Sequence, residues 1–225
     1  MNSSIRALLF DFDGVVLDTE TPEVLVWKRI YSEYGFEFPV ERVLQTIGHM
    51  GYPNFDPAQT LHEWTRDSLD PKELHARHRR ESNELIEQEP VGEGVLEVIA
   101  QARMLGLKIA IASSSPRTWV EPHLKRLGLA EAFDLVVTSD LVTPGRFKPL
   151  PDIYLKALEL LALSAAQTLA FEDSPPGIRA AHGAGVFVVA VPNPVTAQLD
   201  LEDADFKIQS LCDVNLPDLL ERAAR

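Results

Sequence analysis

Five short apolar runs, separated by turns and by segments with helical spacing of apolar residues, constrain the fold of this chain more than any other feature. Continuous apolar strands, as opposed to alternating ones, are typical of a parallel sheet that is buried on both faces. Glycines follow three of the helical segments, at places where helices are expected to end. The runs are IRALLF (5–10), LKIAIA (107–112), DLVVTS (134–139), TLAF (168–171) and VFVVAV (186–191). Strands that alternate with helices in this way predict an α/β fold with a doubly wound, Rossmann-like parallel sheet.

The stretch from residue 18 to residue 89 breaks this alternation. It contains no convincing buried strand, but it has helix start signals such as Asp56 followed by Pro57, an N-cap residue before a proline in the first turn. An insert of about 70 residues is too long for an ordinary connecting loop. We therefore expect an α/β core formed by residues 1–17 and 90–225, and a small α-helical domain formed by residues 18–89. The two linkers between them, near residues 15–20 and 88–93, would lie side by side and act as a hinge.

The charge balance restricts the kinds of partner. The chain carries 21 Lys and Arg against 34 Asp and Glu, a formal net charge of −13 at pH 7. Nucleic acids and anionic membranes are bound by basic surfaces, and no run approaches the ~18 apolar residues that a membrane span needs. The basic exception, LHARHRRES (74–82), is expected to be the solvated face of a helix. We therefore expect no nucleic acid and no membrane as partner, and an anionic substrate would need a metal ion or a lysine nearby.

The cysteine content bears on the compartment. Cys212 is the one cysteine of the chain, so no intrachain disulfide can form. A chain without a disulfide framework is typical of a reducing compartment. We therefore expect a cytoplasmic protein with Cys212 in its core. Nothing in the sequence demands more than a monomer, and the expected state is a monomer or a weak homodimer.

Polar side chains follow four of the five apolar runs. In open parallel sheets, ligands bind at the carboxyl ends of the strands, so we expect these side chains to converge on one crevice. They are Asp11 and Asp13 after the first run, Ser113, Ser114 and Ser115 after the second, Asp140 and then Lys148 after the third, and Glu172 and Asp173 after the fourth.

These residue types indicate a particular chemistry. Several buried carboxylates repel one another unless a cation binds them or one of them stays protonated. Oxygen ligands without clustered His or Cys favour Mg²⁺ over zinc. A metal ion held by Asp11 and Asp173, with Lys148 adding positive charge and Ser113 donating hydrogen bonds, would make a site for a phosphoryl group.

Four strings of the sequence carry a resemblance to a known family. They are DFDGVVLDTE (11–20), IASSS (111–115), FKPLPDIY (147–154) and FEDSPPGIRAAHGAG (171–185). In this order they resemble the four motifs of the haloacid dehalogenase superfamily, over nearly all of the predicted core. Together with the helical insert, they resemble the β-phosphoglucomutase and phosphoglycolate phosphatase-like branch, in which the insert is a mobile cap.

The resemblance implies roles for the carboxylates. Asp11 would be the nucleophile that forms an aspartyl-phosphate. Asp13 would protonate the leaving oxygen and then accept a proton from the hydrolytic water, while its backbone carbonyl binds Mg²⁺. Asp173 would be a further Mg²⁺ ligand, and Glu172 would bind the ion directly or through water. The two motif-one aspartates can divide these roles only if their surroundings separate their pKa values.

The resemblance also implies which residues hold the phosphate and which read the substrate. Ser113, Ser114 and Lys148 would bind the phosphoryl oxygens. Phe147 precedes this lysine where the family usually has glycine, so the shape of that loop is not implied. Candidates for substrate specificity are weaker. They are Glu20 at the start of the insert, His49 at the tip of the predicted cap and Arg117 after the second strand, with Thr46, Tyr52 and Trp64 as further cap candidates.

The tryptophans have a plainer interpretation. Trp27, Trp64 and Trp119 are expected to pack in the two cores rather than to stack on a substrate.

The implied activity is a Mg²⁺-dependent phosphatase that hydrolyses a small phosphorylated metabolite. Members of the family that cleave carbon–halogen bonds or phosphonates lack the counterpart of Asp13, so this residue indicates phosphate esters. The alternative is a sugar phosphomutase. Mutases of this branch carry a lysine where this chain has Ile47 and a histidine where it has Glu23, and both differences favour a hydrolase.

A different class of function also remains open. An aspartate after a strand is found in phosphoacceptor modules used in signalling, and a relative without activity could bind a phospho-ligand. Receiver modules need neither a cap of about 70 residues nor a pair of aspartates. A silent relative would be expected to have lost Asp11 or Asp13, and both are present.

Overall fold

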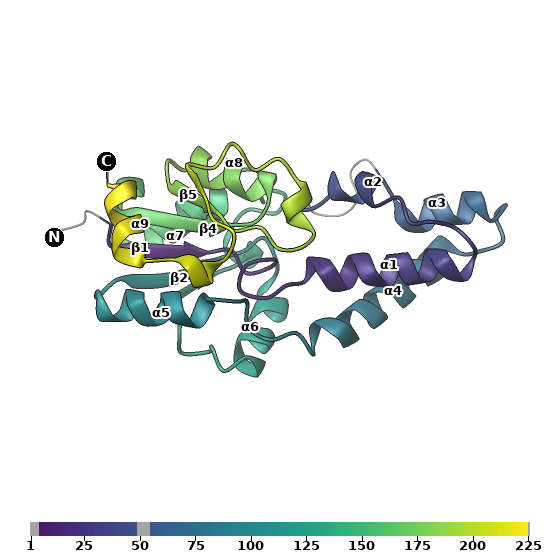
Figure 1. Cartoon of the computed structure of the whole chain (residues 1–225), viewed down its shortest axis with the longest axis horizontal. Coiled ribbons are helices and arrows are strands. Elements are labelled where there is room, and N and C mark those ends of the chain that lie inside the picture. Colours follow the sequence, from purple (N-terminus) through teal and green to yellow (C-terminus); the bar gives the residue numbers. More distant parts are fainter. Residues whose placement is uncertain (1–4, 49–54, 225) are drawn as a thin grey trace.

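Figure 1 shows the computed structural model of the chain, which describes residues 5–48 and 55–224. Within that part of the chain the sheet has six strands, all of its neighbouring pairs are parallel, and the strand order is β3-β2-β1-β4-β5-β6. The strands are β1 (Ala7–Phe10), β2 (Lys108–Ala112), β3 (Leu135–Val137), β4 (Thr168–Glu172), β5 (Phe187–Ala190) and β6 (Phe206–Lys207). Strand β1 lies between β2 and β4, so the chain reverses its direction of travel across the sheet there.

Helices cover both faces of this sheet (Figure 1). One face packs on α5 (Val95–Met104), α6 (Arg117–Arg126) and α9 (Leu216–Ala223), and the other packs on α7 (Asp152–Leu161) and α8 (Pro175–Gly183). Successive residues of β1 alternate between the two apolar clusters, since Leu8 and Phe10 join the first and Leu9 joins the second. The predicted doubly wound α/β fold is thereby confirmed, and the continuous apolar runs are explained by burial on two sides. Short 3₁₀ turns lie at Ser139–Leu141, Ala165–Gln167, Thr196–Gln198 and Leu211–Asp213.

Two elements near the C-terminal end of the core have no counterpart in the sequence-based prediction. Strand β6 is only two residues long, too short to give a pattern. Asn215 is the N-cap of helix α9, and its side chain accepts a hydrogen bond from the backbone N–H of Asp218. The expectation that Cys212 is a core residue is wrong, because its side chain is exposed in the 3₁₀ turn that precedes this helix.

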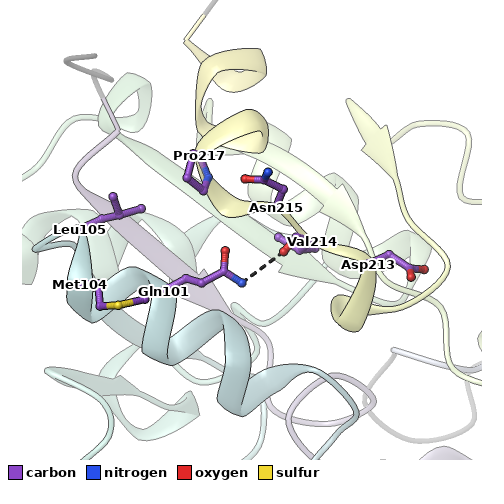
Figure 2. A pocket seen from close by; sticks show the side chains of 7 residues that line it. All are labelled: Gln101, Met104, Leu105, Asp213, Val214, Asn215 and Pro217. Atoms are coloured by element: carbon purple, nitrogen blue, oxygen red, sulfur yellow. Dashed lines mark hydrogen bonds between the residues drawn. The ribbon is translucent and has the colours of Figure 1, made fainter.

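Gln101 joins α9 to the rest of the core. Its Nε2 donates to the carbonyl oxygen of Val214 over 3.2 Å, and its Oε1 accepts from the backbone N–H of Leu216 over 2.9 Å. A pocket of about 470 Å³ lies beside this contact, and Figure 2 shows the side chains that line it, Met104 among them. The pocket lies near the end of α5, which leads into the start of β2, and therefore at the amino ends of the strands.

The segment inserted after β1 is helical, as predicted. Its helices are α1 (Glu20–Glu33), α2 (Val40–Leu44), α3 (Pro57–Trp64) and α4 (Pro71–Ile86), and they extend away from the sheet (Figure 1). Asp56 and Asp70, each followed by a proline, are the N-caps of α3 and α4. Asp56 accepts two backbone hydrogen bonds from the first turn and Asp70 accepts one. No helix of the described segments is long and apolar enough to cross a membrane.

These helices share an apolar cluster of their own, with Trp27 and Tyr31 fully buried at its centre. Trp64 is 41% exposed and its ring contacts that of Tyr31, so the expectation that it packs in a core is met only in part. Val195 from the core also joins the cluster. We infer that α1–α4 form the cap domain that the insert implied.

The basic stretch in α4 is only half solvated, which corrects the expectation of a solvated face. Arg77 pairs with Glu33 and Glu81 at 2.6 and 2.8 Å on the outer side. The opposite side is buried, where the ring of His78 stacks on Trp27 with 4.3 Å between ring centroids. The helical period places these two kinds of residue on different faces of the same helix.

The two linkers between core and cap touch, as expected for a hinge. The backbone N–H of Gly92 donates to the carbonyl oxygen of Val16 over 2.8 Å, and a Cβ atom at Gly92 would lie 2.2 Å from the carbonyl oxygen of Val15. Gly94, two residues further on, begins α5 with φ +81°, and a Cβ atom there would lie 2.2 Å from the backbone nitrogen of Cys212.

The close approach at Gly94 gives a test of the fold. Gly94→Ala and Gly128→Ala both place a side chain at positive φ, which costs about 1–2 kcal/mol, but a Cβ at Gly128 meets open space. We expect Gly94→Ala to lower the free energy of unfolding by a further 1–3 kcal/mol, roughly the cost of overpacking. Urea unfolding of the two variants measures the difference. Equal losses would show that the backbone of the 3₁₀ turn before α9 does not lie against Gly94.

Candidate active site

The candidate site begins at the carboxyl end of β1. Asp11 follows the strand directly, and its backbone N–H donates to the carbonyl oxygen of Phe171 in β4 over 3.0 Å. The side chain is buried, and Oδ1 accepts from the backbone N–H of Phe12 over 2.7 Å. Because β2 and β4 flank β1, Ser113 and Glu172 reach the same edge of the sheet. The sequence-based expectation that the central strand ends converge is confirmed for these residues.

Lys148 is the positive charge at the centre of the site. Its Nζ lies 2.7 Å from Asp11 Oδ1 and 2.7 Å from Glu172 Oε1, and the lysine side chain is only 3% exposed. Burial by itself lowers the pKa of a lysine, but the two carboxylates outweigh it and raise the pKa of Lys148 above its ordinary value. The lysine therefore stays charged and neutralises part of the acidic cluster.

The two carboxylate oxygens of Glu172 have different surroundings. Its Oε1 also accepts a hydrogen bond from the hydroxyl of Tyr154, whereas Oε2 is buried and has no hydrogen-bond partner among the described residues. A Cβ atom at Gly177 would lie 1.8 Å from Oε2, so any larger residue at the start of α8 would displace this carboxylate. Tyr154 closes the third motif in the sequence, but sequence reasoning gave it no role.

Three carboxylates form a group that fits a metal ion. Oxygens of Asp11, Glu172 and Asp173 lie within 4.8 Å of one another, and all three side chains are buried. Burial and then the charge of Glu172 raise the pKa of Asp11 to about 7 in spite of Lys148. Burial and the charge of Asp11 likewise raise the pKa of Asp173 well above its ordinary value. Acids destabilised in this way, together with the unpartnered Glu172 Oε2, fit a divalent cation that would supply the missing positive charge.

Asp173 is oriented by two neighbours. The side-chain Nδ2 of Asn193 donates to its Oδ2 over 2.9 Å, and a Cβ atom at Gly14 would lie 2.0 Å from the same oxygen. Ser174, and not Asp173, caps α8, since its Oγ accepts from Gly177 N over 3.3 Å. Sequence reasoning missed Asn193, although it follows the fifth apolar run and the same strand-end argument applies to it.

Asp13 is surrounded by donors from the segment after β2. Trp119 Nε1 donates to Oδ1 over 2.8 Å, and the hydroxyls of Ser115 and Ser113 donate to Oδ2 over 2.6 and 3.3 Å. Burial and the charge of Asp11 raise the pKa of Asp13, while the hydrogen bonds from Ser115 and Trp119 lower it in part. Trp119 does pack against the core as expected, but its indole N–H reaches the site. A buried tryptophan usually finds a partner for its N–H, and that rule is the signal that could have indicated this contact.

Three further residues predicted at the strand ends, Ser114, Asp140 and Arg117, make contacts of different kinds. Ser114 Oγ accepts from the backbone N–H of Lys148 over 3.3 Å and so supports the loop that carries the lysine. Asp140 Oδ2 accepts from the backbone N–H of Arg117 over 2.6 Å, at the start of α6. Asp140 therefore stabilises the start of α6, in contrast to the expectation that it joins the crevice. The guanidinium of Arg117 is exposed and lies 3.4 Å from Glu121.

Three described residues of the cap bear on the site predictions. Glu20, in the first turn of α1, is half-buried, and burial, then Glu23 and Asp13, raise its pKa well above its ordinary value. A Cβ atom at Gly48 would lie 2.7 Å from Ser174 Oγ, so the cap touches the core next to Asp173. Thr46 is buried and donates its hydroxyl hydrogen bond to the carbonyl oxygen of Val43. His49 and Tyr52 lie outside the described residues.

The charge of the cluster predicts how metal affects stability. With a folded-state pKa of about 7, against an ordinary value of 3.8, Asp11 binds a proton in the folded state that the unfolded chain releases. Its contribution to the stability of metal-free protein is therefore full below pH about 3.8 and falls as the pH rises towards 7. We expect Mg²⁺ to raise the melting temperature more at pH about 7.5 than at pH about 5.

Asp11→Asn is the control for this prediction, because it removes the titrating group and one oxygen charge. We expect its melting temperature to depend less on pH in the absence of metal and to rise less with Mg²⁺. A Mg²⁺ shift that is the same at both pH values in both proteins would contradict the account.

Comparison with known proteins places the chain in a family. The family model described as haloacid dehalogenase-like hydrolase matches residues 8–191. YhcW of Bacillus subtilis (strain 168), whose name assigns it provisionally to the phosphatases, is 41% identical over 217 residues and covers 96% of this chain and 97% of its own. The phosphorylated carbohydrates phosphatase of Thermotoga maritima is 34% identical over 186 residues, which are 81% of this chain and 82% of that protein.

A solved structure agrees with this placement. CbbY of Rhodobacter sphaeroides in complex with phosphate has a TM-score of 0.69 and 25% sequence identity, and the match covers 94% of this chain and 96% of that chain. The chain belongs to the haloacid dehalogenase-like hydrolases, the family that its four motifs resemble.

Proposed function

We propose that this phosphatase hydrolyses a small phosphorylated metabolite with Mg²⁺ as cofactor and Asp11 as the phosphoryl acceptor. The single observation that carries the proposal is the contact of 2.7 Å between Lys148 Nζ and Asp11 Oδ1 within a buried acidic cluster. A lysine beside a carboxylate places positive charge where a phosphoryl group would meet its acceptor. The names of relatives that act on phosphorylated carbohydrates support a sugar phosphate or a similar metabolite as substrate.

The chemistry follows in two halves. In the first, Asp11 attacks phosphorus, the bond to the leaving oxygen breaks, and Asp13 gives that oxygen its proton, so that a neutral alcohol departs. In the second, a water molecule attacks the aspartyl-phosphate, its proton goes to Asp13, and inorganic phosphate leaves with Asp11 restored. Lys148 and the hydroxyl of Ser113 would balance charge on the phosphoryl oxygens in both halves.

The carboxylates support Mg²⁺ as the ion. Hard oxygen donors without nitrogen or sulfur are the ligands that this ion prefers. Asp11, Asp173 and the backbone carbonyl of Asp13 would hold it, with Glu172 in the same group. When bound, the ion would neutralise negative charge on the phosphoryl group and keep Asp11 ionised for attack.

The cap supports hydrolysis over mutase activity. Ile47, at the position where sugar phosphomutases of this branch carry a lysine, is buried in the apolar cluster of the cap. Ile47 therefore packs in the cap and, unlike a lysine, offers no positive charge to the phosphate of a substrate. The expected cytoplasmic location and monomeric or weakly dimeric state stay predictions.

Phosphate release from a panel of esters tests the proposal. The panel contains a sugar phosphate, 2-phosphoglycolate and an aryl phosphate, each with and without Mg²⁺. We expect Asp11→Asn to reduce release by at least about 10⁴-fold, as for the loss of a nucleophile, and Asp13→Asn by about 10²–10⁴-fold, as for the loss of a general acid. Asp203→Asn, which removes an exposed carboxylate in a distant turn, should retain activity.

Two outcomes would contradict this proposal. Release that persists without Mg²⁺ or in Asp11→Asn would remove the metal or the nucleophile from the mechanism. A protein that isomerises a sugar 1-phosphate without releasing phosphate would be the mutase.

A further inference from the structure

The carboxylate of Asp13 accepts hydrogen bonds from two kinds of donor, an indole N–H and serine hydroxyls. Trp119 Nε1 lies 2.8 Å from Oδ1, and Ser115 Oγ lies 2.6 Å from Oδ2, with Ser113 Oγ at 3.3 Å. An indole N–H can only donate a hydrogen bond, whereas a serine hydroxyl can donate or accept. The two oxygens of the carboxylate are therefore not equivalent.

This difference decides where a proton can reside on Asp13. A proton on Oδ1 would take one of the two lone pairs of that oxygen and make it a weaker acceptor for the indole N–H. A proton on Oδ2 keeps the indole hydrogen bond, because the hydroxyl of Ser115 can turn and accept. The donor-only contact of Trp119 thus favours Oδ1 as the acceptor and Oδ2 as the oxygen that exchanges a proton.

We propose that Trp119 is a positioning residue for acid–base catalysis, which fixes the carboxylate of Asp13 through Oδ1 and assigns proton exchange to Oδ2. The proposal rests on the phosphatase function given above. As the bond from phosphorus to the leaving oxygen breaks, Oδ2–H gives its proton to that oxygen. When water attacks the phosphoryl group on Asp11, one water proton returns to Oδ2 and hydrogen phosphate leaves.

The indole is itself well fixed. It packs against the core cluster on α6, and its ring meets the ring of His123 edge-on with 4.5 Å between centroids. The backbone N–H of Trp119 donates to the carbonyl oxygen of Pro116 over 2.9 Å, in the first turn of the helix. A donor that is already held by packing orients its acceptor with little loss of freedom.

The test compares leaving groups in Trp119→Phe, which keeps an aromatic ring and removes the N–H. Values of kcat/KM report the steps up to departure of the alcohol, so they isolate the first proton transfer. For aryl phosphates whose leaving groups span a wide range of pKa, we expect little change with the best leaving groups. With the poorest leaving groups the loss should be about 10- to 100-fold, the range for a hydrogen bond to a charged group.

Two further variants separate positioning from packing. Asp13→Asn should show the steepest dependence of kcat/KM on leaving-group pKa, and adding Trp119→Phe to it should not steepen the dependence further. Val120→Ala removes fully buried side-chain atoms from the same helix without touching Asp13. It should lower the melting temperature and leave the leaving-group dependence as in the wild type.

The outcomes are distinguishable. A loss in Trp119→Phe that is equal for all leaving groups, or no loss at all, would overturn the positioning role while the phosphatase function stands. A further steepening when Trp119→Phe is added to Asp13→Asn would also overturn it, because Trp119 would then act by another route. If the wild type releases phosphate from no ester, the proposed function itself fails.

Discussion

The buried contact of Lys148 with Asp11 and Glu172 is the interaction on which the rest of the site depends. Taking charges out of water is costly, and it is tolerated only where each charge meets another. Here one lysine faces three carboxylates once Asp173 is included, so the cluster keeps an excess of negative charge. A site with an excess of negative charge is suited to a divalent cation, and a phosphoryl group can bind there together with that cation.

The fold supplies this cluster through its topology. Strand β1 runs between β2 and β4, so three strand ends present their next residues within one small region. The glycines beside the site allow close approach, since a Cβ at Gly14 or Gly177 would overlap a carboxylate oxygen. The inserted helical segment also contacts the core beside the site, where a Cβ at Gly48 would lie 2.7 Å from Ser174 Oγ.

Much of this arrangement could be predicted from the sequence, because its causes are local. Continuous apolar runs indicate burial on both faces, Asp11 follows the first run directly, and Lys148 lies in the loop after the third. Contacts made by residues distant from the strand ends could not be predicted in the same way. Trp119 is three residues into a helix, and only the packing of that helix aims its N–H at the site. The exposure of Cys212 could not be predicted either, because a lone apolar residue in a short 3₁₀ turn carries no periodic signal.

The central claim is that Asp11 accepts the phosphoryl group, and the most direct test is to look for that group on the protein. The wild type would be mixed with a good substrate and Mg²⁺, quenched in acid during turnover and mapped by mass spectrometry. The account predicts a phosphoryl group on the peptide that contains Asp11 and on no other peptide. Turnover with that peptide unmodified under conditions that preserve an acyl phosphate, or a phosphoryl group on another residue, would contradict it.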